Sequence, residues 1–312
     1  VLEEISRVSA AIGIMIAVHN SVGALPVFRF GTDEQRRRFL PRLVSKELGA
    51  FCLSEPGCGS DAAALTSTAV RDGDRYVLNG AKNWVTNGEQ AGVYLVFART
   101  SKDGGSRGIS AFIVERGTPG LVLGKPEDKM GLRGSETVGL TLEDLKVPVE
   151  QRLGAEGEGF SIAMSMLDAG RVGVAAQALG VMRAAFEEAV KYAQQRRAFG
   201  GPIAKIQAIQ FKLAEMERRI QNSRLLTQKA AWLKDTDQPY TREASMAKLY
   251  ASEAATWVTH QAIQVHGGYG YVKEYPVERY YRDARVMEIY EGTSEIQRLV
   301  IARSLLKDGV KV

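Results

Sequence analysis

The stretch MEIYEGTSEIQRL, residues 287–299, places the carboxylate of Glu291 between an aromatic residue and a glycine, where one helix ends and another begins. Ser294 is expected to cap the last helix, with Gln297 three residues later completing a capping box. Glu291 then precedes this helix in a loop whose glycine, Gly292, allows unusual backbone angles. A functional carboxylate and a helix-start acid favoured by the helix dipole both fit this local pattern.

Two stretches in the first third of the chain offer groups for a bound ligand. LSEPGCGSD, residues 53–61, has two glycines that would let the backbone approach a ligand, and it adds the polar groups of Ser54, Ser60 and Asp61. In KNWVTNG, Trp84 and Thr86 are two residues apart, so on a strand they face the same side and could contact a flat heterocycle. An ordinary turn and a core tryptophan are the structural alternatives.

Two stretches in the second half pair charge with glycine. QRRAFGGPIAKIQ, residues 195–207, puts Arg196 and Arg197 before a Gly-Gly-Pro break, where a guanidinium suits a phosphate or a carboxylate. Capping of a helix C-terminus explains the same pattern. QVHGGYGY, residues 264–271, again has paired glycines that permit close approach.

The elements that must position these groups fall into three regions. Residues 1–49 are predicted to form an N-terminal helical domain, with apolar residues at helical spacing and a second helix over 32–44 capped by Thr32 or Asp33. Residues 151–312 predict long helices, over about 175–192, 206–234 and 242–266 and after residue 291, that form an antiparallel four-helix bundle.

Residues 50–150 have the texture of a middle antiparallel β domain, because glycine is frequent and the apolar runs are short. DRYVLNGAKNWVTNG predicts a strand, an Asn-Gly turn and a second strand. AGVYLVFART and GISAFIVER predict buried strands, and a sandwich or a barrel is the simplest closed form. The fold class is therefore α+β and multidomain.

Composition narrows the function classes. Of 312 residues, 45% are hydrophobic and 25% charged, which is typical of globular protein. The net charge is +5, and the basic residues are interspersed with acidic ones. This pattern disfavours nucleic-acid binding and is compatible with an anionic small-molecule ligand. The two cysteines fit neither a zinc knuckle nor a redox pair, and indicate a reducing compartment. Three scattered histidines predict no metal site. We expect no membrane insertion, since no apolar run reaches transmembrane length and no signal peptide is evident.

Six motifs in fixed order identify a family. SEPGCGSD, NWVTNG, LDAGR, RRAFGGPI, QVHGGYGY and YEGTSEIQR together resemble the acyl-CoA dehydrogenase family, most closely its short-chain (butyryl-CoA) branch, over essentially the whole chain. Family members carry additional helices before the point where this sequence begins, so we expect the N-terminal domain to be truncated. Cys58 stands where alanine is common in the family and puts a thiol near the expected cofactor.

The resemblance implies FAD-dependent desaturation of an acyl-CoA thioester between its α and β carbons, a step of fatty acid β-oxidation. Glu291 would remove the α-proton while the β-hydrogen leaves as hydride to flavin N5. The backbone N–H of the glutamate and a ribityl hydroxyl would stabilise the enolate oxygen. Desolvation by the acyl pocket is expected to raise the carboxyl pKa more than the helix start lowers it. Some relatives supply the base from the position of Gly170, which here has no side chain.

The same match assigns residues to ligands. For the acyl-CoA it implies Ser60, Asp168, Arg171, Tyr290 and Gly292. For FAD it implies Phe51, Leu53, Ser54, Ser60, Trp84, Thr86, Arg196, Phe199, Gln207, Gln264, Gly267, Gly268, Thr293 and Glu295. In the family the contacts to the FAD pyrophosphate and adenosine come from a neighbouring subunit, which implies an obligate homo-oligomer, usually a tetramer built as a dimer of dimers.

The implied electron acceptor is electron-transfer flavoprotein, and the implied compartment is the bacterial cytoplasm, or the mitochondrial matrix in a eukaryote. A branched-chain or aromatic acyl-CoA dehydrogenase and an acyl-CoA oxidase share the fold and stay open as alternatives. A flavin-free helical scaffold or nucleic-acid-binding relative is a third hypothesis, against which the intact YEGTSE motif argues.

Overall fold

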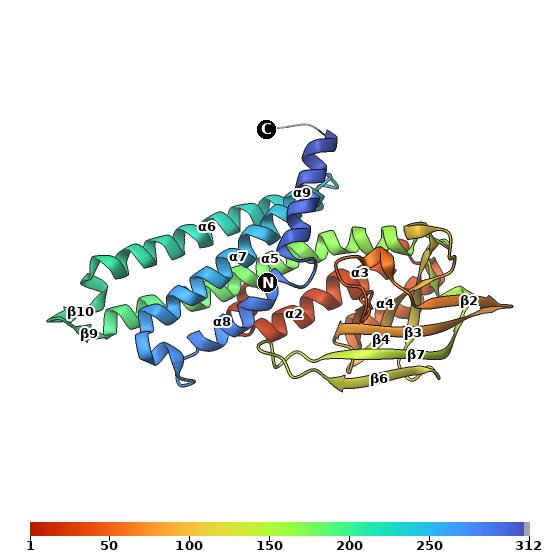
Figure 1. Cartoon of the computed structure of the whole chain (residues 1–312), viewed down its shortest axis with the longest axis horizontal. Coiled ribbons are helices and arrows are strands. Elements are labelled where there is room, and N and C mark those ends of the chain that lie inside the picture. Colours follow the sequence, from red (N-terminus) through yellow and green to blue (C-terminus); the bar gives the residue numbers. More distant parts are fainter. Residues whose placement is uncertain (309–312) are drawn as a thin grey trace. The chain divides into compact units, whose positions relative to one another are not determined.

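The computed structural model describes residues 1–308, and the chain divides into two compact units. The first unit contains Val1–Ile14, Lys129–Gly134 and the chain from Arg171 onward. The second contains Met15–Asp128 and Ser135–Gly170. Along the chain, helices come first, then a β-sheet, then long helices, which confirms the predicted α+β class (Figure 1).

Short helices form the N-terminal region, and a capping box starts the best defined of them. They are α1 (Leu2–Val8), α2 (Ala10–Val18), a π-helix (His19–Ala24), α3 (Leu25–Phe30) and α4 (Asp33–Ser45). The Thr32 hydroxyl accepts a hydrogen bond from the Gln35 N–H at 3.2 Å, and the Gln35 side chain accepts one from the Thr32 N–H at 3.0 Å. Thr32 rather than Asp33 is therefore the N-cap, and both orphan donors are satisfied.

The helical stretch Ala10–Phe30 corrects one expectation. Its 21 residues are long and apolar enough to cross a membrane by length and composition, so the prediction that no apolar run is long enough is wrong. A helix in the core of a globular fold meets the same test. Val22 and Val27 are each only 1% exposed, and Val27 packs with Phe39 and Leu43 in a buried cluster, as expected of a core helix.

One sheet of eight strands organises the second unit. The hydrogen-bonded order is β6-β7-β3-β2-β4-β5-β8; β1 pairs with β4 in parallel, and most other pairs are antiparallel. β2 meets β4 through a single residue pair, so the sheet has two halves, one around β3 and one around β4. The strands are β1 (Leu48–Cys52), β2 (Thr68–Asp72), β3 (Arg75–Thr86), β4 (Ala91–Arg99), β5 (Ile109–Glu115), β6 (Leu121–Pro126), β7 (Thr137–Pro148) and β8 (Arg152–Leu153).

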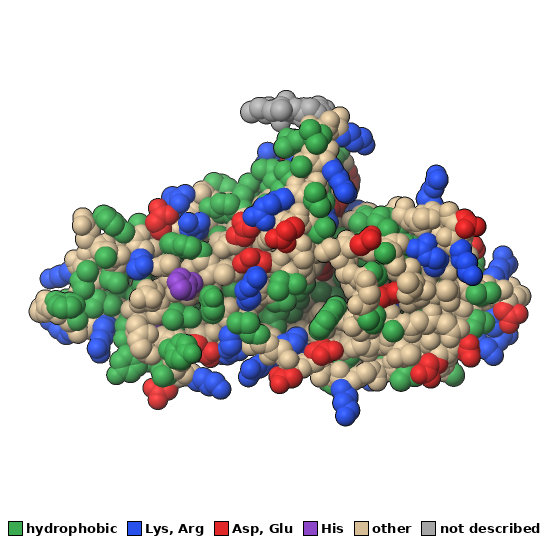
Figure 2. Space-filling view, in the orientation of Figure 1, with side chains coloured by type: hydrophobic (Ala, Val, Ile, Leu, Met, Phe, Trp, Pro, Cys, Tyr) green, Lys and Arg blue, Asp and Glu red, His purple; other side chains and the backbone are tan. Residues whose placement is uncertain are grey.

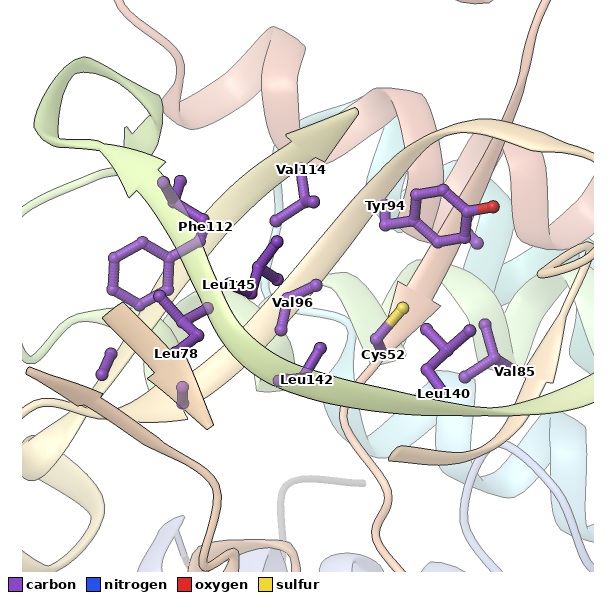
Figure 3. Packing of buried hydrophobic residues seen from close by; sticks show 14 of the residues in the cluster. Cys52, Leu78, Val85, Tyr94, Val96, Phe112, Val114, Leu140, Leu142 and Leu145 are labelled. Carbon is purple, nitrogen blue, oxygen red and sulfur yellow. The ribbon is translucent and has the colours of Figure 1, made fainter. Parts of the chain in front are cut away.

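Both faces of β4 are buried, which explains its unbroken apolar run. Tyr94 and Val96 point into a core shared with β3 and β7, where Leu78 and Leu140 lie (Figure 3). The alternate residues of β4 contribute to a second cluster with α3, α4 and the start of α5 (Gly159–Gln195). Because successive side chains of a strand point to opposite faces, a strand covered on both sides needs apolar residues at every position.

The Asn79-Gly80 pair does not make the predicted hairpin turn, because β3 continues through it. The Asn79 amide donates to Asp144 at 3.0 Å, and the Asp144 N–H donates to the Asn79 side chain at 2.9 Å, which ties β3 to β7. The strand register shifts here and Gly80 has a φ of +144°, so the pair marks a β-bulge. The turn lies earlier, at Gly73 (φ +59°), between β2 and β3.

Long helices build the first unit, and α7 packs against α6, α8 and α9. The predicted helices over 206–234 and 242–266 are α6 (Gln207–Asp235) and α7 (Thr241–His266), and the last is α9 (Ser294–Asp308). A further helix, α8 (Val277–Arg285), was not predicted. The predicted break after α5 holds a small hairpin of β9 (Arg197–Ala198) and β10 (Gly201–Pro202). Short 3-10 helices lie at Ala62–Ala64, Gly105–Gly108, Val149–Gln151, Ile203–Lys205, Gly267–Tyr271 and Val286–Glu288.

Charges of both signs are interspersed on the surface. The face in Figure 2 carries basic and acidic side chains side by side, without a field of one sign. On this face, no basic stripe of the kind that binds a nucleic-acid backbone is visible.

Gly180 lets α1 pack closely on α5. A Cβ at this position would lie 2.3 Å from the Glu3 carbonyl oxygen, a backbone atom that cannot rotate away. We expect Gly180→Ala to lower the free energy of unfolding by about 1–3 kcal/mol. The steric cost outweighs the helix preference of alanine over glycine, which is about 1 kcal/mol.

Urea denaturation measures this change, with Gly201→Ala as the matched control. The nearest atom to a Cβ at Gly201 is 3.7 Å away, an ordinary contact, so the control should stay within about 0.5 kcal/mol of wild type. Equal stability of the two variants would show that α1 does not pack on α5 in this way.

Candidate active site

The Glu291 loop connects the 3-10 helix Val286–Glu288 to α9 and has an unusual backbone. Glu291 has a φ of +53° and Gly292 a φ of +92°. The left-handed region costs a residue with a Cβ about 1–2 kcal/mol, so the surrounding structure must hold Glu291 in place. A Cβ on Gly292 would lie 2.6 Å from the Gln297 amide nitrogen, so the glycine is needed for both its φ and the space around it.

The cap of α9 differs from the prediction. The Thr293 hydroxyl, not Ser294, accepts the hydrogen bond from the Ile296 N–H, at 3.3 Å. The Gln297 side chain reaches back as expected, but it donates to two carbonyl oxygens, that of Glu291 at 3.2 Å and that of Gly292 at 2.9 Å. Gln297 is fully buried, and its amide closes the loop onto the first turn of the helix.

The Glu291 carboxyl is set apart by its surroundings. The side chain is half-buried, and its Oε2 is a buried atom with no hydrogen-bond partner among the described residues. Burial raises the pKa of this carboxyl to about 7, against the lowering effect of Arg171 and Lys248. A carboxyl that titrates near neutral pH can take a proton from a weak carbon acid and hold it, which is what a general base requires.

Two cations act on this carboxyl from two helices. Arg171 on α5 is 5% exposed, and its guanidinium donates to the Ser245 hydroxyl on α7 at 3.5 Å. Lys248, also on α7, is fully buried and donates to the Gly292 carbonyl at 2.6 Å. Burial lowers the pKa of Lys248 to about 8, although Glu291 opposes this change.

Tyr290 anchors the other side of the loop. Its hydroxyl donates to the Gln177 side chain on α5, and the Gln177 amide donates to the Ala10 carbonyl at 2.8 Å. Burial first, and the Glu291 charge second, raise the pKa of Tyr290 well above its usual value. The phenol therefore stays neutral and serves as a hydrogen-bond donor.

The predicted substrate contacts are divided between the two units. Arg171, Tyr290 and Gly292 lie around Glu291 within the first unit. Asp168 is half-buried on α5 and Ser60 is exposed, both in the second unit. Two further residues were predicted to approach the cofactor: Thr293, which caps α9, and Glu295, which is exposed. Gly170, the position from which some relatives supply the base, is buried in α5.

A cavity of about 570 Å³ gathers four of the predicted FAD contacts. Arg196, Gln264, Gly267 and Gly268 line it, together with His266. Gly267 has a φ of +60°, and a Cβ on either glycine would meet no atom within 4 Å, so a ligand can approach the backbone there. The guanidinium and the bare backbone suit a pyrophosphate, and the buried Nε2 of His266 has no partner within residues 1–308. These residues fit the nucleotide part of FAD.

Two other predicted FAD contacts lie outside the lining of this cavity. Phe199 is 96% exposed at the tip of the β9–β10 hairpin, with a φ of +51°. Gln207 is exposed at the start of α6. An apolar ring held in a left-handed conformation in solvent is typical of a contact site for another molecule.

The loop over residues 53–61 in the second unit rests on a buried ion pair. The Lys82 ammonium lies 2.7 Å from the Glu55 carboxylate and donates to the Leu53 carbonyl at 3.3 Å. The side chain of Leu53 is buried in the core, so a ligand contact from Leu53 would come from its backbone, and Phe51 is partly buried against the same cluster. Ser54 is half-buried, and its backbone carbonyl accepts a hydrogen bond from the Asn83 N–H at 2.9 Å, which links this loop to β3.

Trp84 is not the core tryptophan that the structural alternative proposed. The register of β3 against β7 shifts between Lys82 and Val85, and Trp84 in this bulge has a φ of +60° and is 62% exposed. Thr86, two residues on, is half-buried. A strained, exposed indole beside a hydroxyl can stack on a flat heterocycle, as the flavin ring requires.

Sequence reasoning missed Lys248, Gln177 and the Lys82–Glu55 pair. For Lys248 a signal existed: in EASMAKLYASEAA it lies on the same helical stripe as Ala244 and Ala251, which are both buried. A lysine on an apolar stripe must find a partner, because an isolated buried charge is too costly. Gln177 and Lys82 gave no comparable signal.

Three regions of the chain, in consecutive order, match known protein domains. The sequence matches the acyl-CoA dehydrogenase N-terminal domain over residues 1–47, the middle domain over 50–145 and the C-terminal domain over 157–306. It is 55% identical over 307 residues to the mitochondrial short-chain specific acyl-CoA dehydrogenase of Bos taurus, covering 98% of this chain and 74% of that protein.

Two solved structures have the same fold. Butyryl-CoA dehydrogenase from Megasphaera elsdenii superposes with a TM-score of 0.97 at 48% identity, covering 98% of this chain and 80% of that one. A chain in the structure of the electron transferring flavoprotein of Acidaminococcus fermentans gives a TM-score of 0.97 at 49% identity, covering 98% and 81%. The three domain matches and these identities establish that the chain belongs to the acyl-CoA dehydrogenase family.

Proposed function

We propose that this protein is an FAD-dependent short-chain acyl-CoA dehydrogenase that converts a butyryl-type thioester to the trans-2-enoyl-CoA, with Glu291 as the base. The observation that carries the proposal is the Glu291 carboxyl, which burial brings to a pKa of about 7 on a loop held at φ +53°. The identity of 55% to a short-chain specific enzyme supports the substrate class.

The chain's own groups account for the proton transfer. Glu291 takes the α-proton; its partly buried carboxyl is a stronger base than a solvated one, which matches a weak carbon acid. Its backbone N–H makes no hydrogen bond within the described part of the chain, so it is available to the thioester oxygen as enolate charge develops. FAD, when bound, supplies the acceptor for the β-hydrogen, which leaves as hydride.

Two parts of the chain would hold the cofactor, the Arg196 cavity and the β3 bulge at Trp84. Arg196 and the backbone of Gly267 and Gly268 would hold the pyrophosphate, because their cavity offers a guanidinium and two glycines whose backbone no neighbouring atom covers on the Cβ side. Trp84 and Thr86 would hold the flavin ring, because the β3 bulge presents an exposed indole. The remaining predicted FAD and acyl-CoA contacts are also part of this proposal. The proposed domain limits are 1–49, 50–150 and 151–312.

We also propose an electron acceptor, an oligomeric state and a cellular location. The electron acceptor would be an electron-transfer flavoprotein, in line with the similarity to a chain in such a structure. A homo-oligomer, a dimer of dimers, would let one subunit supply the Arg196 cavity to the FAD of another. The location would be the bacterial cytoplasm, or the mitochondrial matrix in a eukaryote, since relatives include both a mitochondrial protein and one from Bacillus subtilis.

Anaerobic titration of the purified yellow protein with acyl-CoAs of graded length tests the proposal. We expect the flavin absorbance to bleach most completely with butyryl-CoA, and less with hexanoyl- and octanoyl-CoA. Preferential bleaching by a branched or aromatic acyl-CoA, or fast reoxidation by oxygen, would replace the proposal by one of the alternatives on the same fold. Protein that purifies without flavin and cannot be reconstituted with FAD would refute it.

A further inference from the structure

The Glu291 loop is held by two donors that differ in charge. The Gly292 carbonyl accepts one hydrogen bond from the Lys248 ammonium at 2.6 Å and one from the Gln297 amide at 2.9 Å. Both side chains are fully buried, and they come from different helices, α7 and α9. A single carbonyl next to the base is thus fixed from two sides, once by a cation and once by a neutral group.

Burying a lysine in an alanine-rich stripe of α7 is unfavourable unless the charge has a use. The ammonium loses its hydration, and the backbone carbonyl of Gly292 is the hydrogen-bond acceptor that replaces it. A neutral donor such as glutamine would satisfy the same carbonyl at less desolvation cost. The choice of lysine therefore points to its charge rather than to its hydrogen bond alone.

The charged groups around the loop determine how Lys248 affects the ionisation of Glu291. Glu291 is faced by Arg171 on α5 and by Lys248 on α7. Lys248 in turn is faced by Glu291, Arg171, Glu288 at the end of the preceding 3-10 helix, and Glu295 on α9. Tyr290, which adjoins the base, stays neutral. The two cations together oppose the effect of burial, which disfavours the ionised form of Glu291.

We propose that Lys248 is a positioning residue for the base: its ammonium anchors the Gly292 carbonyl, which fixes the backbone of the Glu291 loop, and its charge keeps Glu291 ionised and ready to accept the α-proton. This inference rests on the proposed role of Glu291. It makes the ionisation of the carboxylate, and not only its location, depend on a residue that acts through the loop backbone and through its charge.

Three variants separate the charge from the hydrogen bond. Lys248→Met removes both, Lys248→Gln removes the charge and keeps an amide donor, and Gln297→Leu removes a neutral donor to the same carbonyl. Lys248→Met is expected to fold, because the hydrogen-bond acceptor of Lys248 is a neutral carbonyl that keeps its bond from the Gln297 amide. Flavin content and the circular dichroism spectrum of each holoenzyme verify this.

The readout is the pH dependence of kcat/KM for butyryl-CoA, which reports the ionisation of groups in the free enzyme. We expect the acid limb to move up by about one pH unit in Lys248→Met and Lys248→Gln, because an opposite charge close by is lost. Gln297→Leu should lower kcat about tenfold with the limb unmoved. An acid limb at the wild-type pH in both Lys248 variants, or an equal movement in Gln297→Leu, would overturn the proposal.

This design distinguishes two failures. A wild-type enzyme that does not bleach with any acyl-CoA contradicts the proposed function. A wild-type enzyme that turns over, beside Lys248 variants with an unchanged pH profile, contradicts only the role of Lys248.

Discussion

Glu291→Gln is expected to lower the rate of anaerobic flavin reduction by butyryl-CoA by at least about 10³-fold, while the protein stays yellow. Glutamine keeps the shape of the side chain and can occupy the same loop, but it cannot accept the α-proton. The flavin content should not change, because Glu291 is not among the residues assigned to FAD and glutamine leaves the neighbouring Thr293 and Glu295 in place. Stopped-flow absorbance of the bound flavin measures the rate.

Glu253→Gln is the matched control, since it removes a carboxylate on α7 that is 41% exposed and pairs with Arg298. Its rate of reduction should stay close to wild type. A Glu291→Gln enzyme that bleaches as fast as this control would contradict the assignment of the base.

The same substitution should stabilise the fold at neutral and higher pH. The folded protein holds a proton on Glu291 between pH 4.5 and about 7 that the unfolded chain has released, so the stability of wild type falls as pH rises through this window. The glutamine variant has no such loss. Its gain in unfolding free energy at pH 8 would be at most about 3 kcal/mol, less where water reaches the carboxyl.

Lys82→Met should produce the largest loss of stability that we predict, about 3–5 kcal/mol. Lys82 is fully buried and Glu55 is 5% exposed, so the substitution leaves a carboxylate in the core without its cation. Glu55 would still accept hydrogen bonds from the Thr66 N–H at 2.6 Å and the Ser67 N–H at 3.0 Å, which hold it in place but do not neutralise it. Urea denaturation of the holoenzyme at pH 7 measures the loss.

The double variant Lys82→Met with Glu55→Gln tests the pairing. It should be more stable than the sum of the single losses predicts, because neither partner is left as an unpaired charge. Burial alone would raise the Glu55 pKa, but the Lys82 charge and the hydrogen bonds lower it to about 2. The stability from this carboxylate is therefore present above pH 4.5 and is lost as pH falls toward 2. Strictly additive losses would contradict the ion pair.

The Lys82–Glu55 pair joins the loop over residues 53–61 to β3, and Lys82 directly precedes the bulge that carries Trp84. Loss of the pair should therefore also weaken FAD binding. Equilibrium dialysis of flavin from the Lys82→Met protein measures this effect.

Periodicity gave most of the helices from sequence alone. The limits of α6 and α7 are within about one residue of the prediction because glycine, proline and aspartate mark their ends. The strands β4 and β5 were visible as apolar runs. The prediction of a turn at Asn79-Gly80 was wrong. An Asn-Gly pair favours a hairpin turn, but here hydrogen bonds between Asn79 and Asp144 on β7 keep the strand continuous.

The candidate site was only partly visible. Ordered motifs picked out Glu291, Arg196 and Trp84, since glycine and strained backbone leave local signals. Lys248 and Gln177 act on the loop from more than 40 residues away in the sequence, through contacts that only the packing of α5 and α7 creates. The cap at Thr293 rather than Ser294 shows the same limit, because two adjacent hydroxyl residues suit the role equally by composition.

The claim that Glu291 removes the α-proton can be measured apart from hydride transfer. Methylthioacetyl-CoA has the length of butyryl-CoA but carries sulfur in place of the β-carbon, so it can lose an α-proton and no hydride. In D₂O, proton NMR should show wild-type holoenzyme exchanging the α-hydrogens for deuterium, slowing below about pH 7, and Glu291→Gln giving only the background rate. Exchange by Glu291→Gln at the wild-type rate would contradict the account.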